Sequence, residues 1–180
     1  QFKECVRGIA EACRAFGTPV TGGNVSFYNE HRGRAIDPTP VIGMIGLIEQ
    51  KPAGGRQPTA DSPQLLTASF KDEGDVIIVL GETREELGAS EYLAKIHHLK
   101  RGRPPRVDLQ AERALSRFML EAFERGWLKS AHDCSDGGLA VALAECCIVE
   151  EDHLIGATVD RPPPTAHRPP RPDALFFGES

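Results

Sequence analysis

Two glycine-rich loops carry the residue types that can bind a phosphorylated ligand, and the first reads TGGNVS over residues 21–26. Because glycine has no Cβ, the backbone N–H groups of Gly22 and Gly23 can approach a phosphate closely. Asn24 offers a neutral oxygen, which suits Mg²⁺ when phosphates supply the negative charge. Ser26 lies two residues on and, in extended backbone, faces the same side as Asn24. The loop therefore predicts part of a binding site for nucleotide, metal and substrate. The alternative is a tight turn in which the side chains of Asn24 and Ser26 hydrogen-bond to local backbone groups.

The second glycine loop, residues 132–138, reads HDCSDGG and precedes an apolar run. A helix N-terminus that follows glycines is a ready anion site, so Asp136 and Gly137 form a second candidate phosphate loop. The alternative is that Asp136 simply caps the helix. The His132-Asp133 pair also fits a metal-dependent phosphohydrolase, a class that needs further ligands for which the other histidines qualify only by residue type.

Composition and motifs exclude several other classes. The chain has 180 residues and a net charge of −5, so it has no basic field to attract nucleic acid. It contains no P-loop, no dinucleotide-binding glycine fingerprint and no nucleophile elbow. Its five cysteines include no Cys-x-x-Cys pair, which indicates free thiols in a reducing compartment. There is no apolar run long enough for a membrane span and no signal peptide, so we expect a cytoplasmic protein.

The elements that must position the first loop are an amphipathic helix before it and apolar segments after it. Apolar residues recur at helical spacing through residues 2–15, and Gly17 followed by Pro19 ends that helix. We expect a short strand at 20–21, a turn at 31–37, and a central strand at 41–48 that is covered on both faces. The Pro- and Gly-rich stretch 50–64 indicates a domain boundary.

A second set of elements surrounds the second loop. The apolar and turn patterns predict a helix capped by Asp108 that runs to about Trp127. The other expected elements are a short strand at 65–70, a turn at 71–75, a buried strand at 76–81, a helix at 84–98, a buried helix at 139–148, a strand at 156–159, an extended Pro-rich loop at 161–173 and a return to the core at 174–177.

These runs, taken in order, resemble the large subunit of phosphoribosylformylglycinamidine synthase. The resemblance extends over nearly the whole chain and departs from the family at 50–64 and 161–173. The runs that carry it are residues 17–30, 38–46, 70 with 73–75, 80–83, 88–92, 131–145 and 177–180.

The resemblance implies an α/β (α+β) AIR-synthetase-like fold, in which residues 1–62 end an N-terminal-type ATP-binding domain and residues 63–180 form a C-terminal-type α/β sandwich domain. The family converts formylglycinamide ribonucleotide, ATP and glutamine-derived ammonia to formylglycinamidine ribonucleotide in purine synthesis. Its pattern assigns Gly23 to ATP, Asn24 to Mg²⁺ and Ser26 to the substrate. The second loop would belong to a pseudo-symmetric, structural nucleotide site. The family's catalytic histidines lie in a first copy of the domain pair, so we expect no catalytic residue here.

The resemblance also implies partners, namely formylglycinamide ribonucleotide, a glutaminase subunit and a small bridging subunit. We expect this chain to be a piece of a longer enzyme, to be inactive alone, and to self-associate through open strand edges. The alternatives are another ATP-using enzyme of the superfamily, such as a selenophosphate synthase, thiamine-phosphate kinase or hydrogenase-maturation protein, and a non-catalytic nucleotide-binding assembly module.

Overall fold

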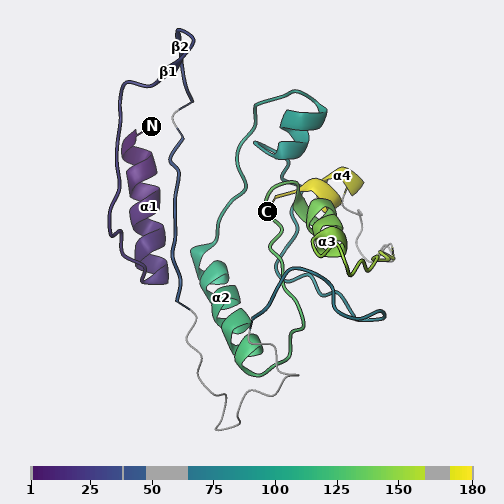
Figure 1. Cartoon of the computed structure of the whole chain (residues 1–180). Coiled ribbons are helices and arrows are strands. Elements are labelled where there is room, and N and C mark those ends of the chain that lie inside the picture. The colour runs from purple at the N-terminus through teal and green to yellow at the C-terminus, as the bar shows by residue number, and fades with distance from the viewer. Residues whose placement is uncertain (1, 38, 48–64, 161–170, 180) are drawn as a thin grey trace. The chain divides into compact units, whose positions relative to one another are not determined.

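The computed structural model describes residues 2–37, 39–47, 65–160 and 171–179. The chain divides into two compact units, Gln1–Lys51 and Pro52–Ser180, which are described separately (Figure 1). The predicted domain boundary at 50–64 and most of the Pro-rich loop lie outside the described residues. The described residues form several helices and one small antiparallel sheet.

The first unit is built on the helix α1 (Phe2–Phe16), as predicted from its amphipathic pattern. Arg7 lies 2.6 Å from Glu4 and 3.6 Å from Glu11, so one cation supports two turns of the helix. At its end Gly17 has φ +69°, and the Thr18 N–H donates to the Cys13 carbonyl at 3.0 Å. This left-handed glycine and backward hydrogen bond form a Schellman cap, which explains why the helix stops there.

After α1 the chain runs back beside the helix and enters a tight hairpin (Figure 1). The Phe2 and Phe27 rings meet edge to face with centroids 5.2 Å apart, which fixes the returning segment against the start of α1. The strands β1 (Glu30–His31) and β2 (Arg34–Ala35) pair antiparallel. Arg32 and Gly33 between them both have positive φ, as a two-residue hairpin turn of this hand requires. The turn predicted at 31–37 is therefore narrower than expected: it occupies residues 32–33, and residues 31 and 34–35 belong to the two strands.

In the second unit, α2 (Leu109–Glu124) has the N-cap that its sequence predicts and ends slightly before the predicted Trp127. The Asp108 carboxylate accepts hydrogen bonds from the backbone N–H groups of Gln110 and Ala111, at 2.9 and 3.2 Å. At the other end Gly126 has φ +67°, and the Trp127 N–H donates to the Ala122 carbonyl at 3.0 Å. Ala122 is fully buried and is the one buried residue of this helix.

The core around the second glycine loop lies between α3 (Gly138–Ile148) and α4 (Pro172–Phe177), which pack against each other (Figure 1). Its buried members are the small residues Ala142, Cys146 and Ala174, which allow the two helices to approach closely. The short π-helix η2 (Tyr92–Ile96) adds an aromatic contact, since the Tyr92 ring stacks on Phe177 at 4.7 Å. The predicted helix at 139–148 is confirmed, with one side exposed.

The predicted strands are wrong within the described residues. Residues 41–47 form no strand, and Ile45 is 99% exposed instead of covered on both faces. Residues 76–80 likewise form no strand, and Val76 is 84% exposed. The predicted short strands at 20–21, 65–70 and 156–159 are also absent. A strand exists only where a neighbour completes its hydrogen bonds, and the described part of the chain supplies no such neighbour for these apolar runs.

The helix predicted at 84–98 is wrong except for its segment Tyr92–Ile96. Two glycines explain its late start. The Ala89 N–H donates to the Arg101 carbonyl at 3.1 Å, which draws residues 88–89 against residues 101–103. Gly88 and Gly102 then cross so closely that a Cβ on Gly88 would lie 2.1 Å from the Arg103 carbonyl oxygen. At this crossing Ala89 has φ +62°, a left-handed conformation that is incompatible with a right-handed helix that begins at residue 84.

No helix in the described ranges combines the length and the apolar character needed to cross a membrane.

Candidate functional site

The first glycine loop, residues 21–26, stands open to solvent. A Cβ built on Gly22 or Gly23 would meet no atom within 4 Å, so both backbone N–H groups can be approached from outside. The side chains of Asn24 and Ser26 make no hydrogen bond to any described residue. The local hydrogen bond comes instead from Asn29, whose Nδ2 donates to the Ser26 carbonyl at 2.6 Å. The alternative in which Asn24 and Ser26 cap their own turn is therefore not the arrangement found.

These residues fit one side of a site for a magnesium nucleotide. The two glycine amides are donors suited to phosphate oxygens, and the Asn24 amide oxygen and Ser26 hydroxyl are neutral oxygen ligands or donors. A lone amide oxygen does not hold Mg²⁺ tightly, since the ion takes most of its ligands from phosphates, carboxylates and water. No group of three or more His, Cys, Asp or Glu side chains suited to a metal occurs among the residues that the structure describes. The loop thus supplies part of a coordination sphere.

The second glycine loop opens α3 through two left-handed glycines, Gly137 with φ +84° and Gly138 with φ +68°. Gly137 is the N-cap of the helix and no side chain caps it, so the alternative that Asp136 caps the helix is wrong. The Cβ of any other residue at 137 would lie 2.4 Å from Val141 Cγ2, which restricts this position to glycine. The sequence signal for two glycines therefore reflects backbone geometry at the start of α3.

The anion at this helix start is a carboxylate of the chain itself. Glu179 Oε1 accepts hydrogen bonds from the backbone N–H groups of Gly137 and of Glu91, both at 2.8 Å. Glu91 directly precedes η2, so one oxygen joins the starts of two helices. Buried Ser90 supports the same corner, since its hydroxyl donates to the Leu87 carbonyl at 2.7 Å and accepts from the Leu93 N–H at 3.2 Å.

The His132-Asp133 pair is held against α3. His132 Nε2 lies 3.1 Å from Glu145 Oε2, and its Nδ1 lies 2.7 Å from the Asp133 carbonyl oxygen. A hydrogen bond from Ser135 holds the pKa of the Asp133 carboxyl below its usual range. Burial raises the pKa of the neighbouring Cys134 thiol, which disfavours the reactive thiolate. All five cysteines are free, as predicted.

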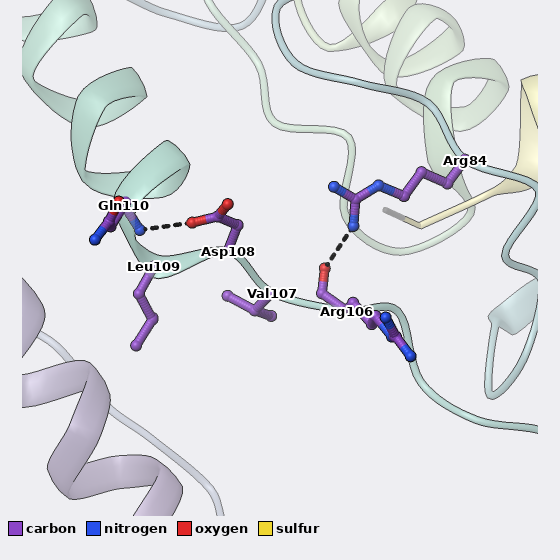
Figure 2. A pocket seen from close by; sticks show the side chains of 6 residues that line it. All are labelled: Arg84, Arg106, Val107, Asp108, Leu109 and Gln110. Carbon is purple, nitrogen blue, oxygen red and sulfur yellow. Dashed lines mark hydrogen bonds between the residues drawn. The ribbon is translucent and has the colours of Figure 1, made fainter.

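A separate depression of about 560 Å³ lies at the start of α2 (Figure 2) and contains none of the predicted site residues. Arg84 Nη1 donates to the Arg106 carbonyl at 3.5 Å across its edge, and Asp108 faces it while bound to the Gln110 N–H. Four of its six lining residues, Arg106, Val107, Asp108 and Gln110, are exposed. It is a surface hollow between two segments and lacks the enclosure of a ligand site.

Residues 177–180 carry part of the family resemblance, but sequence reasoning missed the hydrogen bonds of Glu179 and the crossing of Gly88 with Gly102. Glu179 is a single acid directly after the apolar run Phe176-Phe177-Gly178, and a charge in that position is a second signal that marks it. Its two donors come from segments distant in sequence, so no local pattern reveals them. The crossing glycines left no periodic signal.

Comparison with protein families shows to which family the chain belongs. Residues 1–48 match the family of AIR synthase related proteins through its N-terminal domain, and residues 72–179 match its C-terminal domain. The chain belongs to the AIR synthase related protein family. Together with the mixture of helices and sheet, the order of these matches confirms the predicted AIR-synthetase-like fold class.

Relatives narrow the class to one kind of enzyme subunit. Over 99% of its length the chain is 48% identical to phosphoribosylformylglycinamidine synthase subunit PurL of Anaeromyxobacter sp. (strain Fw109-5), covering 22% of that protein. Subunit PurL of Symbiobacterium thermophilum is 47% identical over 99% of the chain and 21% of the relative. That of Thermobifida fusca is 52% identical over 82% of the chain and 18% of the relative. The chain spans about a fifth of the length of these relatives, and no solved structure matches it.

Proposed function

We propose that this chain forms part of an ATP-dependent ligase that converts formylglycinamide ribonucleotide and glutamine-derived ammonia to formylglycinamidine ribonucleotide in purine biosynthesis. The similarity to PurL subunits along 99% of the chain supports this activity over those of other superfamily members. The observation that carries the proposal is the state of the first glycine loop. Its paired glycines are open, and the side chains of Asn24 and Ser26 have no described partner, so all of these groups can meet a ligand.

Each residue of this loop has a proposed role. The Gly23 N–H binds a phosphate oxygen of ATP, because the absent Cβ permits close approach. The Asn24 side-chain oxygen is one ligand of Mg²⁺, which when bound screens the charge of the phosphates. The Ser26 hydroxyl hydrogen-bonds the ribonucleotide substrate. The Asn29 bond to the Ser26 carbonyl holds the loop in the bend that presents these groups.

We also propose the domain organisation and the setting. Residues 1–62 end an ATP-binding domain of the N-terminal type, and residues 63–180 form the C-terminal-type domain. The family matches at 1–48 and 72–179 lie on either side of the proposed boundary and support it. The expected partners of the whole enzyme are a glutaminase subunit and a small bridging subunit, and the expected location is the cytoplasm. The 180-residue chain is expected to be inactive alone, since no catalytic base is assigned to it.

The test is a chimera in which this chain replaces the aligned segment of the Anaeromyxobacter relative. We expect it to restore growth without purines to a strain that lacks the synthase subunit, and we expect Gly23→Ala to abolish that growth. A methyl group at 23 meets no atom of the protein, so a loss reports on ligand approach. Gly8→Ala in α1 is the matched control, because its added methyl is equally unopposed. Growth with Gly23→Ala equal to that with Gly8→Ala would refute the role of Gly23, and a chimera that supports no growth would refute the activity.

A further inference from the structure

We propose that Glu179 is an internal anion that closes the second glycine loop to phosphate. The start of α3 then has a structural role, because its Gly137 N–H is hydrogen-bonded to the Glu179 carboxylate in the segment that follows α4. The proposal is independent of the function proposed for the first loop, since it concerns the other unit of the chain.

The hydrogen bonds of Glu179 place its charge where a bound phosphate would lie. Gly137 is the N-cap of an 11-residue helix, and its N–H points to Glu179 Oε1 at 2.8 Å. The partial positive charge of a helix start favours an anion at this position. The Glu91 N–H donates to the same oxygen at 2.8 Å, so two amide donors converge on one carboxylate oxygen. Charge-assisted bonds of this kind are stronger than those between neutral groups.

Backbone packing closes the same position sterically. A Cβ on Gly138 would lie 2.6 Å from the Gly178 carbonyl oxygen and 3.0 Å from that of Phe176. The segment 176–178 therefore lies directly against the glycine loop and leaves no room for a side chain at residue 138. A phosphate can enter only if this segment moves away.

The closing segment is anchored on both sides of the loop. On one side Ala174 of α4 is buried against α3, and the Gly178 N–H donates to the Ala174 carbonyl at 3.0 Å. On the other side the Phe177 ring stacks on Tyr92 with an interplanar angle of 10°. Opening the loop therefore requires the loss of apolar packing as well as of two hydrogen bonds, which favours the closed state.

Residue-resolved amide hydrogen exchange on the 180-residue chain tests the proposal, with inorganic pyrophosphate as the probe. In the unsubstituted protein we expect millimolar pyrophosphate to leave the exchange of Gly137 unchanged. Protection of Gly137 by pyrophosphate would overturn the proposal, and this arm needs no variant. Glu179→Ala is expected to speed exchange at both Gly137 and Glu91 by about tenfold, because both donors lose one charged acceptor.

Two further variants separate the carboxylate from general effects on folding. Glu179→Gln keeps an oxygen acceptor without the charge, so we expect an acceleration at Gly137 and Glu91 smaller than that of Glu179→Ala. Glu151→Ala is the matched control, since Glu151 is exposed and makes no contact with a described residue. We expect it to leave both amides unchanged. Equal exchange at Gly137 and Glu91 in Glu179→Ala and Glu151→Ala would overturn the proposal.

Discussion

The side-chain hydroxyl of Ser69 should contribute measurably to the free energy of unfolding of the second unit. It is only 2% exposed, and its hydroxyl donates to Glu150 Oε2 at 2.7 Å while accepting from Lys71 Nζ. The next residue, Phe70, donates its N–H to the Cys146 carbonyl at 3.1 Å. The hydroxyl thus joins residues 67–71 to the end of α3. We expect Ser69→Ala to disconnect these segments.

The magnitude follows from the burial of the hydroxyl. Removing it costs a hydrogen bond to a charged group, and such bonds contribute about 1.5–3 kcal/mol when both partners are shielded. The Glu150 side chain is 51% exposed and regains water, so the loss falls to the lower end of that range or just below it. We expect Ser69→Ala to lower the free energy of unfolding by about 1–2 kcal/mol, measured by urea denaturation at neutral pH. Ser116→Ala on the exposed face of α2 should leave it nearly unchanged.

The same substitution changes the response to acid. The hydrogen bond from Ser69, and then that from Lys71, lowers the pKa of Glu150 in the folded chain. A lowered folded pKa stabilises the protein above the ordinary glutamate range, and this contribution is lost as the pH falls through the folded pKa. We therefore expect Ser69→Ala to lose less stability than the unsubstituted chain on acidification. A variant with unchanged unfolding free energy and an unchanged acid slope would refute the reasoning.

Two further predictions concern backbone crossing and association. Gly88→Ala should destabilise the chain by about 1–3 kcal/mol through overpacking, since its Cβ would lie 2.1 Å from the Arg103 carbonyl oxygen. The control Gly156→Ala should be nearly neutral, because its added Cβ meets nothing within 4 Å. Equal midpoints of thermal denaturation for the two variants would contradict the crossing. The exposed apolar runs 41–47 and 76–80 predict a mass above that of the monomer in light scattering, and a clean monomer would count against self-association.

The sequence predicted those elements whose signals are local. Asp108 was predicted to cap α2 and does so, because a cap acts on residues within one turn of it. The hairpin was likewise marked by its polar, glycine-containing turn. The apolar run at 41–47 carries a strand pattern but no information about its neighbour, so its pairing could not be predicted.

The candidate sites divide in the same way. At the first loop the paired glycines indicated backbone donors, and the structure leaves both glycines open to approach. The sequence of the second loop looked equally suited to phosphate, because it indicates only backbone donors and glycines that can adopt left-handed conformations. Its carboxylate, Glu179, lies in one of the runs that carry the family resemblance, but its hydrogen bond to Gly137 comes from a distant segment and was not predicted. Long-range pairing of this kind is set by tertiary packing and leaves no local signal.

Magnesium-dependent ATP binding by the full-length chimera tests the central claim most directly, because Asn24 is assigned to the metal. Calorimetry should show that Asn24→Ala weakens ATP binding in the presence of Mg²⁺ by about tenfold or more, the loss that one ligand of a charged site can produce. With the metal removed by EDTA, the variant and the unsubstituted chimera should bind ATP equally weakly. Equal ATP affinity of the two proteins in Mg²⁺ would contradict the assignment of the first glycine loop to a magnesium nucleotide.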